Sequence, residues 1–289
     1  MNTVDFDIAE TWQVVLQDEE SQPARLAAAE LSAALIETRR GYDWDQRVVG
    51  IFTLGHADGS DDGYRIEIAP GKVWITGHSR RGVLNGVYAF LEKLGFRWSG
   101  PGKDWVHLPG QRVVSLPVGV TEETPSFAGR CLILGHHAFL ANGEDWIVWA
   151  AHNRLNTVFF HVTQEALAFG AAPEAQYQAM KEHLIPLARQ RGMTIEHGGH
   201  LLSGLLPRNY FRNHPEYFRL KHGVRTPDHN FCPTNSQAIQ ILRQNAAVHF
   251  RAHPEVDVFH IWGDDLPGGG WCECESCRAH SPSEQLLLA

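Results

Sequence analysis

The sequence of 289 residues lacks any apolar run of ~18 residues, the length that a membrane-spanning helix needs. Its first residues, MNTVDFDIAETWQ, have neither the basic start nor the apolar core of a signal peptide. Positive charge is also scarce, with 25 Lys and Arg against 33 Asp and Glu and a net charge of −8. These absences argue against membrane and nucleic-acid partners and predict a cytoplasmic protein.

Cysteine is scarce too, and an odd count of five is a poor basis for a disulfide framework. Three of the five, Cys272, Cys274 and Cys277, have a C-x-C-x-x-C spacing, which fits a reducing compartment with bound metal or free thiols. Such thiolates suit a structural, tetrahedral zinc site, with Cys232 as the first choice of fourth ligand and a histidine as the second. The alternative is three reduced thiols at a loop–helix junction. We expect Cys131 to be buried in a strand.

Histidine and tryptophan, by contrast, are abundant, at 17 and 9 residues. Many histidines stand at the ends of apolar runs, which favours a polar, aromatic cleft of the kind that binds sugars. Drift in composition is the alternative. Hydrophobic residues at 43% and charged residues at 20% are ordinary for a globular protein, and the length predicts two domains.

The first part of the chain has the pattern of a compact α+β unit. Alternating apolar residues predict strands, Gly95 closes an apolar helix, and the Pro70-Gly71 turn predicts a β-hairpin. The expected elements are a strand at 12–16, a helix at 26–36, a strand at 48–54, hairpin strands at 64–68 and 72–76, and a helix at 82–94.

A Val- and Pro-bearing segment from Val113 to Pro125 is interpreted as a linker, which places the domains at 1–121 and 122–289. Beyond it, strands at 131–134, 157–162, 193–200 and 256–262 alternate with helices, which predicts a parallel sheet. The fold class is therefore α/β, with an α+β domain before a TIM-type (β/α) barrel. Only about four of the eight βα units are present, so the chain is either truncated or a half-barrel that forms a homo-oligomer.

Polar residues follow every predicted strand of this second domain, and the ends of parallel strands converge on one rim. They are His136 and His137, then His161, then His197 and His200, and finally His260 with Asp264 and Asp265. A shared cleft is the functional interpretation, and satisfied structural histidines are the alternative. Strand parity turns His260, Trp262 and Asp264 towards the barrel interior. Two close carboxylates suit acid and base roles, whereas the alternative is an N-cap and turn pair before Pro267.

Five motifs resemble the N-terminal domain of α-glucuronidases and β-hexosaminidases, and most closely the bacterial family labelled domain of unknown function 4838. They are Gly63-Tyr-Arg-Ile-Glu-Ile, Trp74-Ile-Thr-Gly77, the helix from Arg81 to Glu92, Leu94-Gly-Phe-Arg-Trp98 and Pro101-Gly102. The resemblance covers about residues 10–110 and implies that a (β/α)8 barrel carrying the active site follows.

The segment His260-Ile-Trp-Gly-Asp264-Asp265 resembles the fourth-strand acid motif of family 20 hexosaminidases. The resemblance implies that Asp264 orients the 2-acetamido nucleophile of the substrate and that Asp265 is the general acid. Trp262 replaces a usual glycine, and Asp265 replaces a glutamate. The candidate substrate-binding residues are His136, His161, His260 and Trp262 from the strand ends, and Asn153, Arg154, His197 and His200 from segments that resemble the lining of the sugar pocket in related barrels.

These features predict a glycoside-hydrolase-like protein that acts on or binds glycans containing amino sugars or uronic acids. In its full-length form it would be a glycosidase that hydrolyses O-glycosyl bonds with no cofactor for catalysis. The alternative is an inactive carbohydrate-binding or truncated remnant that has a structural zinc or cysteine cluster.

Overall fold

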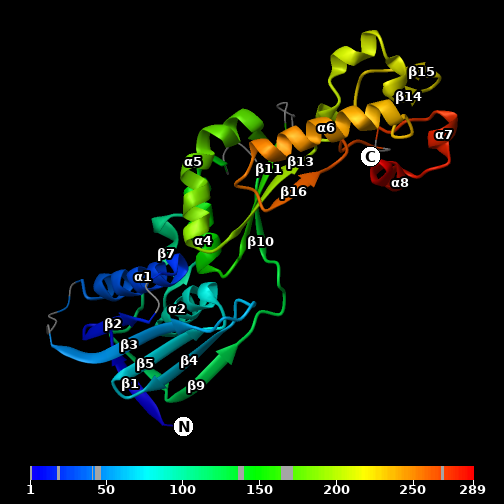
Figure 1. Ribbon diagram of the computed structural model, residues 1–289. Helices are drawn as coiled ribbons and strands as arrows, with labels where there is room; N and C mark the ends of the chain where they lie inside the picture. Colours follow the sequence, from blue (N-terminus) through cyan, green and yellow to red (C-terminus); the bar gives the residue numbers. More distant parts are fainter. Residues whose placement is uncertain are drawn as a thin grey trace. The chain divides into compact units, whose positions relative to one another are not determined.

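The computed structural model describes residues 2–17, 20–40, 42, 47–135, 140–163, 172–267 and 270–289 (Figure 1). The chain divides into two compact units. Unit 1 comprises Met1–Leu132, Asn142–Val158 and His183–Thr194. Unit 2 comprises Ile133–Ala141, Phe159–Glu182 and Ile195–Ala289. No helix in the described ranges is long and apolar enough to cross a membrane.

A five-stranded mixed sheet forms the centre of unit 1, in the order β2 (Thr11–Leu16), β3 (Val48–His56), β5 (Lys72–Gly77), β4 (Tyr64–Ala69) and β9 (Gly119–Glu123). β2, β3 and β5 are parallel, and β4 is antiparallel to both of its neighbours. Tyr64, Ile66 and Ile68 alternate along β4 and are buried, as expected for a strand with one face on the core. The predicted hairpin is therefore present.

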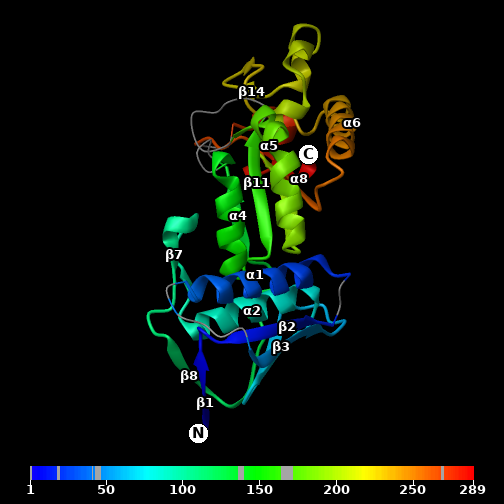
Figure 2. The same cartoon turned by 90° about the vertical axis from the view of Figure 1, so that its left-hand side faces the viewer.

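Helices α1 (Gln22–Thr38) and α2 (Arg80–Leu94) cover one face of this sheet (Figure 2). Ser21 caps α1, Ser79 caps α2, and Gly95 ends α2 in the left-handed conformation at φ 109°. The core between helices and sheet includes Phe52 and Phe90, both fully buried, and each such side chain contributes roughly 1.5–3 kcal/mol. The capped helix that the sequence predicts at 82–94 thus begins two residues earlier.

The interpretation of Val113–Pro125 as a linker is wrong. Val113–Pro117 is β8, which pairs antiparallel with β1 (Thr3–Asp7), and β9 extends the central sheet beside β4. Both segments become strands by pairing with β1 and β4, which lie far away in the sequence, and a local pattern does not reveal such pairing. The domain boundary near residue 122 stays a prediction.

A network of polar side chains lies inside unit 1, centred on Asp62. Its Oδ2 accepts hydrogen bonds from Arg81 Nη1 at 2.8 Å, Arg130 Nη2 at 2.6 Å and Asn156 Nδ2 at 3.0 Å. Arg81 is nearly buried, and burial lowers its pKa although the Asp62 carboxylate opposes that effect. The network connects the segment before β4 with α2, with the segment before β10 (Cys131–Leu134) and with the one that follows α4 (Gly143–His152).

The second sheet runs in the order β10, β11 (Thr157–Thr163), β13 (Thr194–Gly199) and β16 (Val258–Ile261), with the short β12 (Ala172–Pro173) beside β11. β13 and β16 are parallel. Helices α4, α5 (Glu174–Gln190) and α6 (Ser236–Ala252) alternate with the strands, so the α/β class is confirmed. Within the described ranges the sheet does not close into a barrel.

Short elements complete each unit. Unit 1 also has β6 (Arg97–Trp98), η1 (Lys103–Trp105) and β7 (Val106–His107). In unit 2, η2 (Ser203–Leu205), η3 (Arg208–Arg212) and η4 (Pro215–Tyr217) precede the hairpin of β14 (Leu220–Lys221) and β15 (Val224–Arg225). α7 (Glu275–Arg278) and α8 (Pro282–Leu288) follow, and Ser281 caps α8. Leu206, Phe218 and Phe231 belong to one buried hydrophobic cluster of unit 2.

Candidate functional site

Four rings surround Trp262 at the end of β16 in unit 2. The ring centroid of Trp262 lies 5.2 Å from that of His161, 5.4 Å from His200, 5.5 Å from Phe159 and 5.7 Å from His260. We call these five residues the Trp262 cluster. They come from β11, from the residue after β13 and from β16, so the predicted meeting of strand-end residues is seen for His161, His200, His260 and Trp262.

The register of β13 and β16 decides which side chains join the cluster. Gly198 pairs with His260, and His197 pairs with Phe259. Successive side chains point to opposite faces, so His260 lies on the cluster face, whereas Phe259 contacts Phe250 of α6 at a centroid distance of 4.5 Å. The predicted parity of β16 is therefore observed.

Two glycines allow the close approach of the strands at this point. Gly198 and Gly199 have φ values of 130° and 136°, which disfavour any residue with a side chain. A Cβ at Gly199 would lie 2.3 Å from Cδ2 of His161, and one at Gly198 would lie 2.0 Å from the carbonyl oxygen of His260. Trp262 is fixed by its backbone N–H, which donates to Gly199 O at 2.7 Å.

Polar contacts orient the rings and the adjacent carboxylate. His260 Nε2 lies 2.7 Å from Glu196 Oε2, and His200 Nδ1 donates to the carbonyl of Gly263 at 2.6 Å. Ser203 Oγ donates to Asp264 Oδ1 at 2.6 Å, and His229 Nδ1 lies 3.5 Å from Asp264 Oδ2.

The two predicted acids differ in their surroundings. Asp264 is 19% exposed and held by the contacts just given, and its backbone N–H donates to Asn230 Oδ1 at 3.2 Å. Asp265 is exposed and makes no hydrogen bond to any described residue. One carboxylate is thus fixed in orientation, and the next is free to meet a ligand from solvent.

His197 lies on the opposite face of the sheet. It is fully buried, its Nε2 donates to Glu174 Oε2 at 3.1 Å, and its ring lies 4.6 Å from those of Tyr177 and His253. The register with Phe259 explains this placement, because both side chains point into the helix layer. His197 therefore does not join the predicted cleft with His161, His200 and His260.

Glu174 is the centre of this buried network, which the sequence did not predict. His253 Nε2 lies 3.2 Å from Glu174 Oε1, and this hydrogen bond raises the pKa of His253. Burial would raise the pKa of Glu174, but the hydrogen bonds from His197 and His253 lower it. Burial, followed by the charge of His253, lowers the pKa of His249 to about 4. The side chains of Glu174, His197 and His253 are close enough together to hold a metal ion. The hydrogen bonds of the two histidines with Glu174 explain this short spacing equally well.

The other predicted sugar ligands lie elsewhere. In unit 1, Asn153 Nδ2 donates to the carbonyls of Trp149 at 2.9 Å and Trp98 at 3.3 Å. Arg154 Nη1 donates to Glu92 Oε2 at 2.9 Å. Both side chains therefore have structural partners. His136 and His137 lie outside the described residues.

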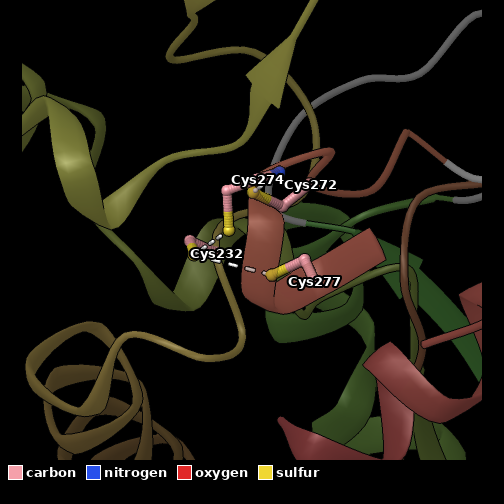
Figure 3. Close-up of side chains that lie close together, drawn as sticks. All are labelled: Cys232, Cys272, Cys274 and Cys277. Atoms are coloured by element: carbon pink, nitrogen blue, oxygen red, sulfur yellow. Dashed lines mark hydrogen bonds between the residues drawn. The ribbon is translucent and has the colours of Figure 1, made fainter. Parts of the chain in front are cut away.

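Four cysteines meet in unit 2 (Figure 3). Cys232 Sγ lies 3.7 Å from Cys277 Sγ and 3.8 Å from Cys274 Sγ. The Sγ atoms of these three residues and of Cys272 all lie within 4.8 Å of one another. Cys232, the first choice of fourth ligand, is thus present in the group. The prediction for Cys131 is wrong, because this residue of β10 is exposed.

Sequence patterns did not identify the residues that hold His260 and Asp264 in place. Glu196 stands one position before His197, so strand parity could have placed it on the face of His260. Asn230 and His229 come from the long polar segment before α6 and carry no local signal. Two hollows of about 600 and 760 Å³ lie along α6 and in unit 1, and neither is lined by a ring of the Trp262 cluster.

Residues 104–285, more than half of the chain, match the model of the family described as a domain of unknown function (DUF4838). The chain belongs to this family. Residues 1–110 match the model described as glycosyl hydrolase family 20, domain 2. The resemblance expected from the five N-terminal motifs is therefore confirmed.

Solved structures of glycoside hydrolases share the fold. A β-N-acetylhexosaminidase from Bacteroides fragilis matches with a TM-score of 0.60 and 15% identity, covering 99% of this chain and 60% of its own. The family 20 exo-β-N-acetylglucosaminidase of Vibrio harveyi in complex with N-acetylglucosamine gives 0.57 and 15%, covering 96% and 47%. The chitobiase of Flavobacterium johnsoniae gives 0.57 and 12%, covering 92% and 43%. This chain thus spans about half the length of these enzymes. No curated protein sequence matches it.

Proposed function

We propose that this chain is part of a glycoside-hydrolase-like protein whose Trp262 cluster binds a glycan containing an amino sugar. The observation that carries the proposal is the gathering of one indole and three imidazoles beside the Asp264–Asp265 pair, at the ends of adjacent strands. An aromatic face contacts the apolar face of a sugar ring, and imidazole nitrogens donate to and accept from its hydroxyls. Uronic acids are the second substrate class in this proposal.

The two acids take different roles in the proposed reaction. Asp264, held by Ser203 and His229, orients the 2-acetamido group so that its carbonyl oxygen attacks C1 of the sugar. Asp265, which is exposed, donates its proton to the glycosidic oxygen as the bond from C1 to that oxygen breaks. Asp265 then accepts a proton from the water that attacks C1 and opens the cyclic intermediate. This division needs no cofactor for cleavage, and zinc at the four cysteines would have a structural role.

The binding surface of the proposal comprises His161, His200, His260 and Trp262, with His136 as the contribution expected from the end of β10. His197, Asn153 and Arg154 are left out because their side chains are occupied by Glu174, by backbone carbonyls and by Glu92.

The sheet of unit 2 would supply the first four strands of a (β/α)8 barrel, after an N-terminal domain at 1–121. The two family models support a two-part chain, because one ends at residue 110 and the other begins at residue 104. The names of the similar structures, which include an N-acetylglucosaminidase in complex with N-acetylglucosamine, favour amino sugars over uronic acids.

Hydrolysis of aryl N-acetyl-β-glucosaminide and aryl glucuronide by the longest natural form of the protein tests the proposal. We expect turnover of the first substrate, and a loss of at least ~100-fold in kcat in Asp265→Asn, the usual contribution of a general acid. Glu182→Gln, an exposed acid on α5, is the matched control and should keep full activity.

Two results would redirect the proposal. Full activity in Asp265→Asn would exclude Asp265 as the acid. Sugar binding without turnover would favour an inactive carbohydrate-binding protein, the alternative function, and would leave the Trp262 cluster in place as the binding surface.

A further inference from the structure

The four cysteines take no part in the proposed hydrolysis, yet their arrangement is specific. Zinc bonds to thiolates are about 2.3 Å long, so the edge of a tetrahedral zinc–sulfur site is about 3.8 Å. The distances from Cys232 Sγ to Cys277 Sγ and Cys274 Sγ are 3.7 and 3.8 Å. A disulfide would need sulfurs about 2.0 Å apart, and none of the cysteines forms one.

The four sulfurs come from two segments of unit 2 that are 40 residues apart in the sequence. Cys232 stands just before α6, Cys272 and Cys274 lie in the segment after Trp271, and Cys277 is in α7 (Figure 3). Cys232, Cys272 and Cys277 are almost fully buried, and Cys274 is partly exposed. A group built from distant segments, closed on most sides, is typical of a structural metal site with no open position for a substrate.

Donors around the sulfurs suit a negatively charged cluster. Backbone N–H groups of Leu220 and Cys274 donate to Cys272 Sγ at 3.3 and 3.5 Å. Arg225 Nη1 lies 3.6 Å from the same sulfur, and Thr234 Oγ1 lies 3.2 Å from Cys277 Sγ. Four thiolates and one Zn²⁺ carry a net charge of −2, which the guanidinium and the N–H groups offset.

The acid between Cys272 and Cys274 is already paired with other groups. Glu273 stands between Cys272 and Cys274, but its carboxylate pairs with Lys221 Nζ and accepts from the backbone N–H of His222. The ligand set is therefore four sulfurs, which selects zinc over magnesium or calcium.

We propose that Cys232, Cys272, Cys274 and Cys277 bind one structural zinc ion. The ion joins the start of α6 to the segment from Cys272 to Cys277, which follows Asp264 and Asp265 in the chain. The backbone N–H of Leu220 donates to Cys272 Sγ and so connects the hairpin of β14 and β15 to the same site. Trp271, buried directly before Cys272, packs against Gly263, where an added Cβ would lie 2.9 Å from its ring. Zinc thereby fixes one end of the loop that carries Asp264 and Asp265.

Metal content measures this site without any sugar. The whole chain, purified under reducing conditions, is analysed by plasma mass spectrometry and by titration of its thiols before and after a mercurial releases the metal. We expect one zinc per chain, with only Cys131 reacting readily before release. Cobalt(II) in place of zinc should give the visible absorption of a tetrahedral thiolate complex.

Cys274→Ser removes the most accessible ligand, and Cys131→Ser is the matched control outside the site. We expect retained zinc to fall to about a tenth or less in Cys274→Ser, because changes even beyond the ligands cost 10–100-fold in affinity. Cys131→Ser should keep one zinc. If Cys274→Ser fails to fold, removal of zinc from the natural sequence by a chelator, followed by readdition, still tests the site by circular dichroism and metal content.

Several outcomes would overturn the proposal. They are a purified chain with no stoichiometric metal, iron in place of zinc, a disulfide among the four residues, or equal zinc loss in both variants. Glycan binding is not measured, so a negative result here leaves the proposed function untouched, and an inactive protein with one zinc leaves this site intact.

Discussion

Asp62→Asn should destabilise unit 1 more than any ordinary surface change. The Oδ2 atom of Asp62 accepts from two guanidinium groups and one amide, and Arg81 is only 6% exposed. Asparagine preserves the shape but removes the negative charge. The Arg81 guanidinium would then stay buried, with the backbone carbonyls of Arg191 and Leu155 as its remaining acceptors.

The magnitude follows from the geometry. Removing one partner of a buried ion pair costs about 3–5 kcal/mol, because the other charge stays buried without compensation. Arg81 keeps its two carbonyl acceptors, and Arg130 is 19% exposed to solvent. We therefore expect the free energy of unfolding to fall by about 3 kcal/mol, the lower end of this range. Asp62→Ala should cost more, since no oxygen remains.

Urea denaturation followed by tryptophan fluorescence and circular dichroism measures the loss. Asp58→Asn changes an exposed acid in the same segment and should stay within about 0.5 kcal/mol of the natural sequence. A loss below about 1 kcal/mol in Asp62→Asn would refute the reasoning, because the network would then contribute no more than an exposed ion pair.

Three further predictions concern backbone fit and pH. Gly82→Ala should lower the free energy of unfolding by about 1–3 kcal/mol or more, since the new Cβ would lie 2.2 Å from the backbone oxygen of Gly63. Gly199→Ala should displace His161 and change the fluorescence of Trp262, because its Cβ would overlap the imidazole at a φ of 136°. His253→Gln should destabilise unit 2 mainly between the ordinary pKa values of Glu174 and His253, 4.5 and 6.5. The raised pKa of His253 gives stability that is full below 6.5 and lost as pH rises through the folded-state pKa, whereas the lowered pKa of Glu174 gives stability that is lost as pH falls below 4.5.

Each of these has a measurement that could contradict it. Gly110→Ala, with no atom within 4 Å of its Cβ, is the control for Gly82→Ala, and equal melting temperatures would count against the packing argument. An unchanged near-ultraviolet spectrum in Gly199→Ala would show that the close approach is not required. For His253→Gln, urea titrations at pH 5.5 and 8.5 should give the larger difference from the natural sequence at pH 5.5. His249 stays neutral there because its pKa is about 4, and Glu255 and Gln178 also face His253.

Local sequence patterns predicted most elements of the fold. The alternation in β4 and β5 and the cap at Gly95 depend on neighbours within a few residues. β1 and β8 could not be predicted because each forms its strand hydrogen bonds only with the other, more than a hundred residues away. Such pairing is a property of the folded chain, since an edge segment has no strong strand signal of its own.

The candidate site could be predicted only in part, for the same reason. The rule that strand ends converge placed His161, His200, His260 and Trp262 together. The need of a tetrahedral site for a fourth ligand made Cys232 the first choice beside the three closely spaced cysteines. The rule failed for His197, because the register that pairs it with Phe259 is set by β16 and cannot be inferred from β13 alone. Glu174 was missed because its partners lie in β13 and at the end of α6.

Calorimetric titration with N-acetylglucosamine tests the central claim most directly, that the Trp262 cluster is a sugar-binding surface. We expect saturable binding and a Kd at least ~10-fold higher in Trp262→Ala, since a buried aromatic contact is worth about 1.5–3 kcal/mol. Trp105→Ala, an exposed tryptophan of unit 1, should bind like the natural sequence. Equal affinity in Trp262→Ala and the natural sequence would contradict the account.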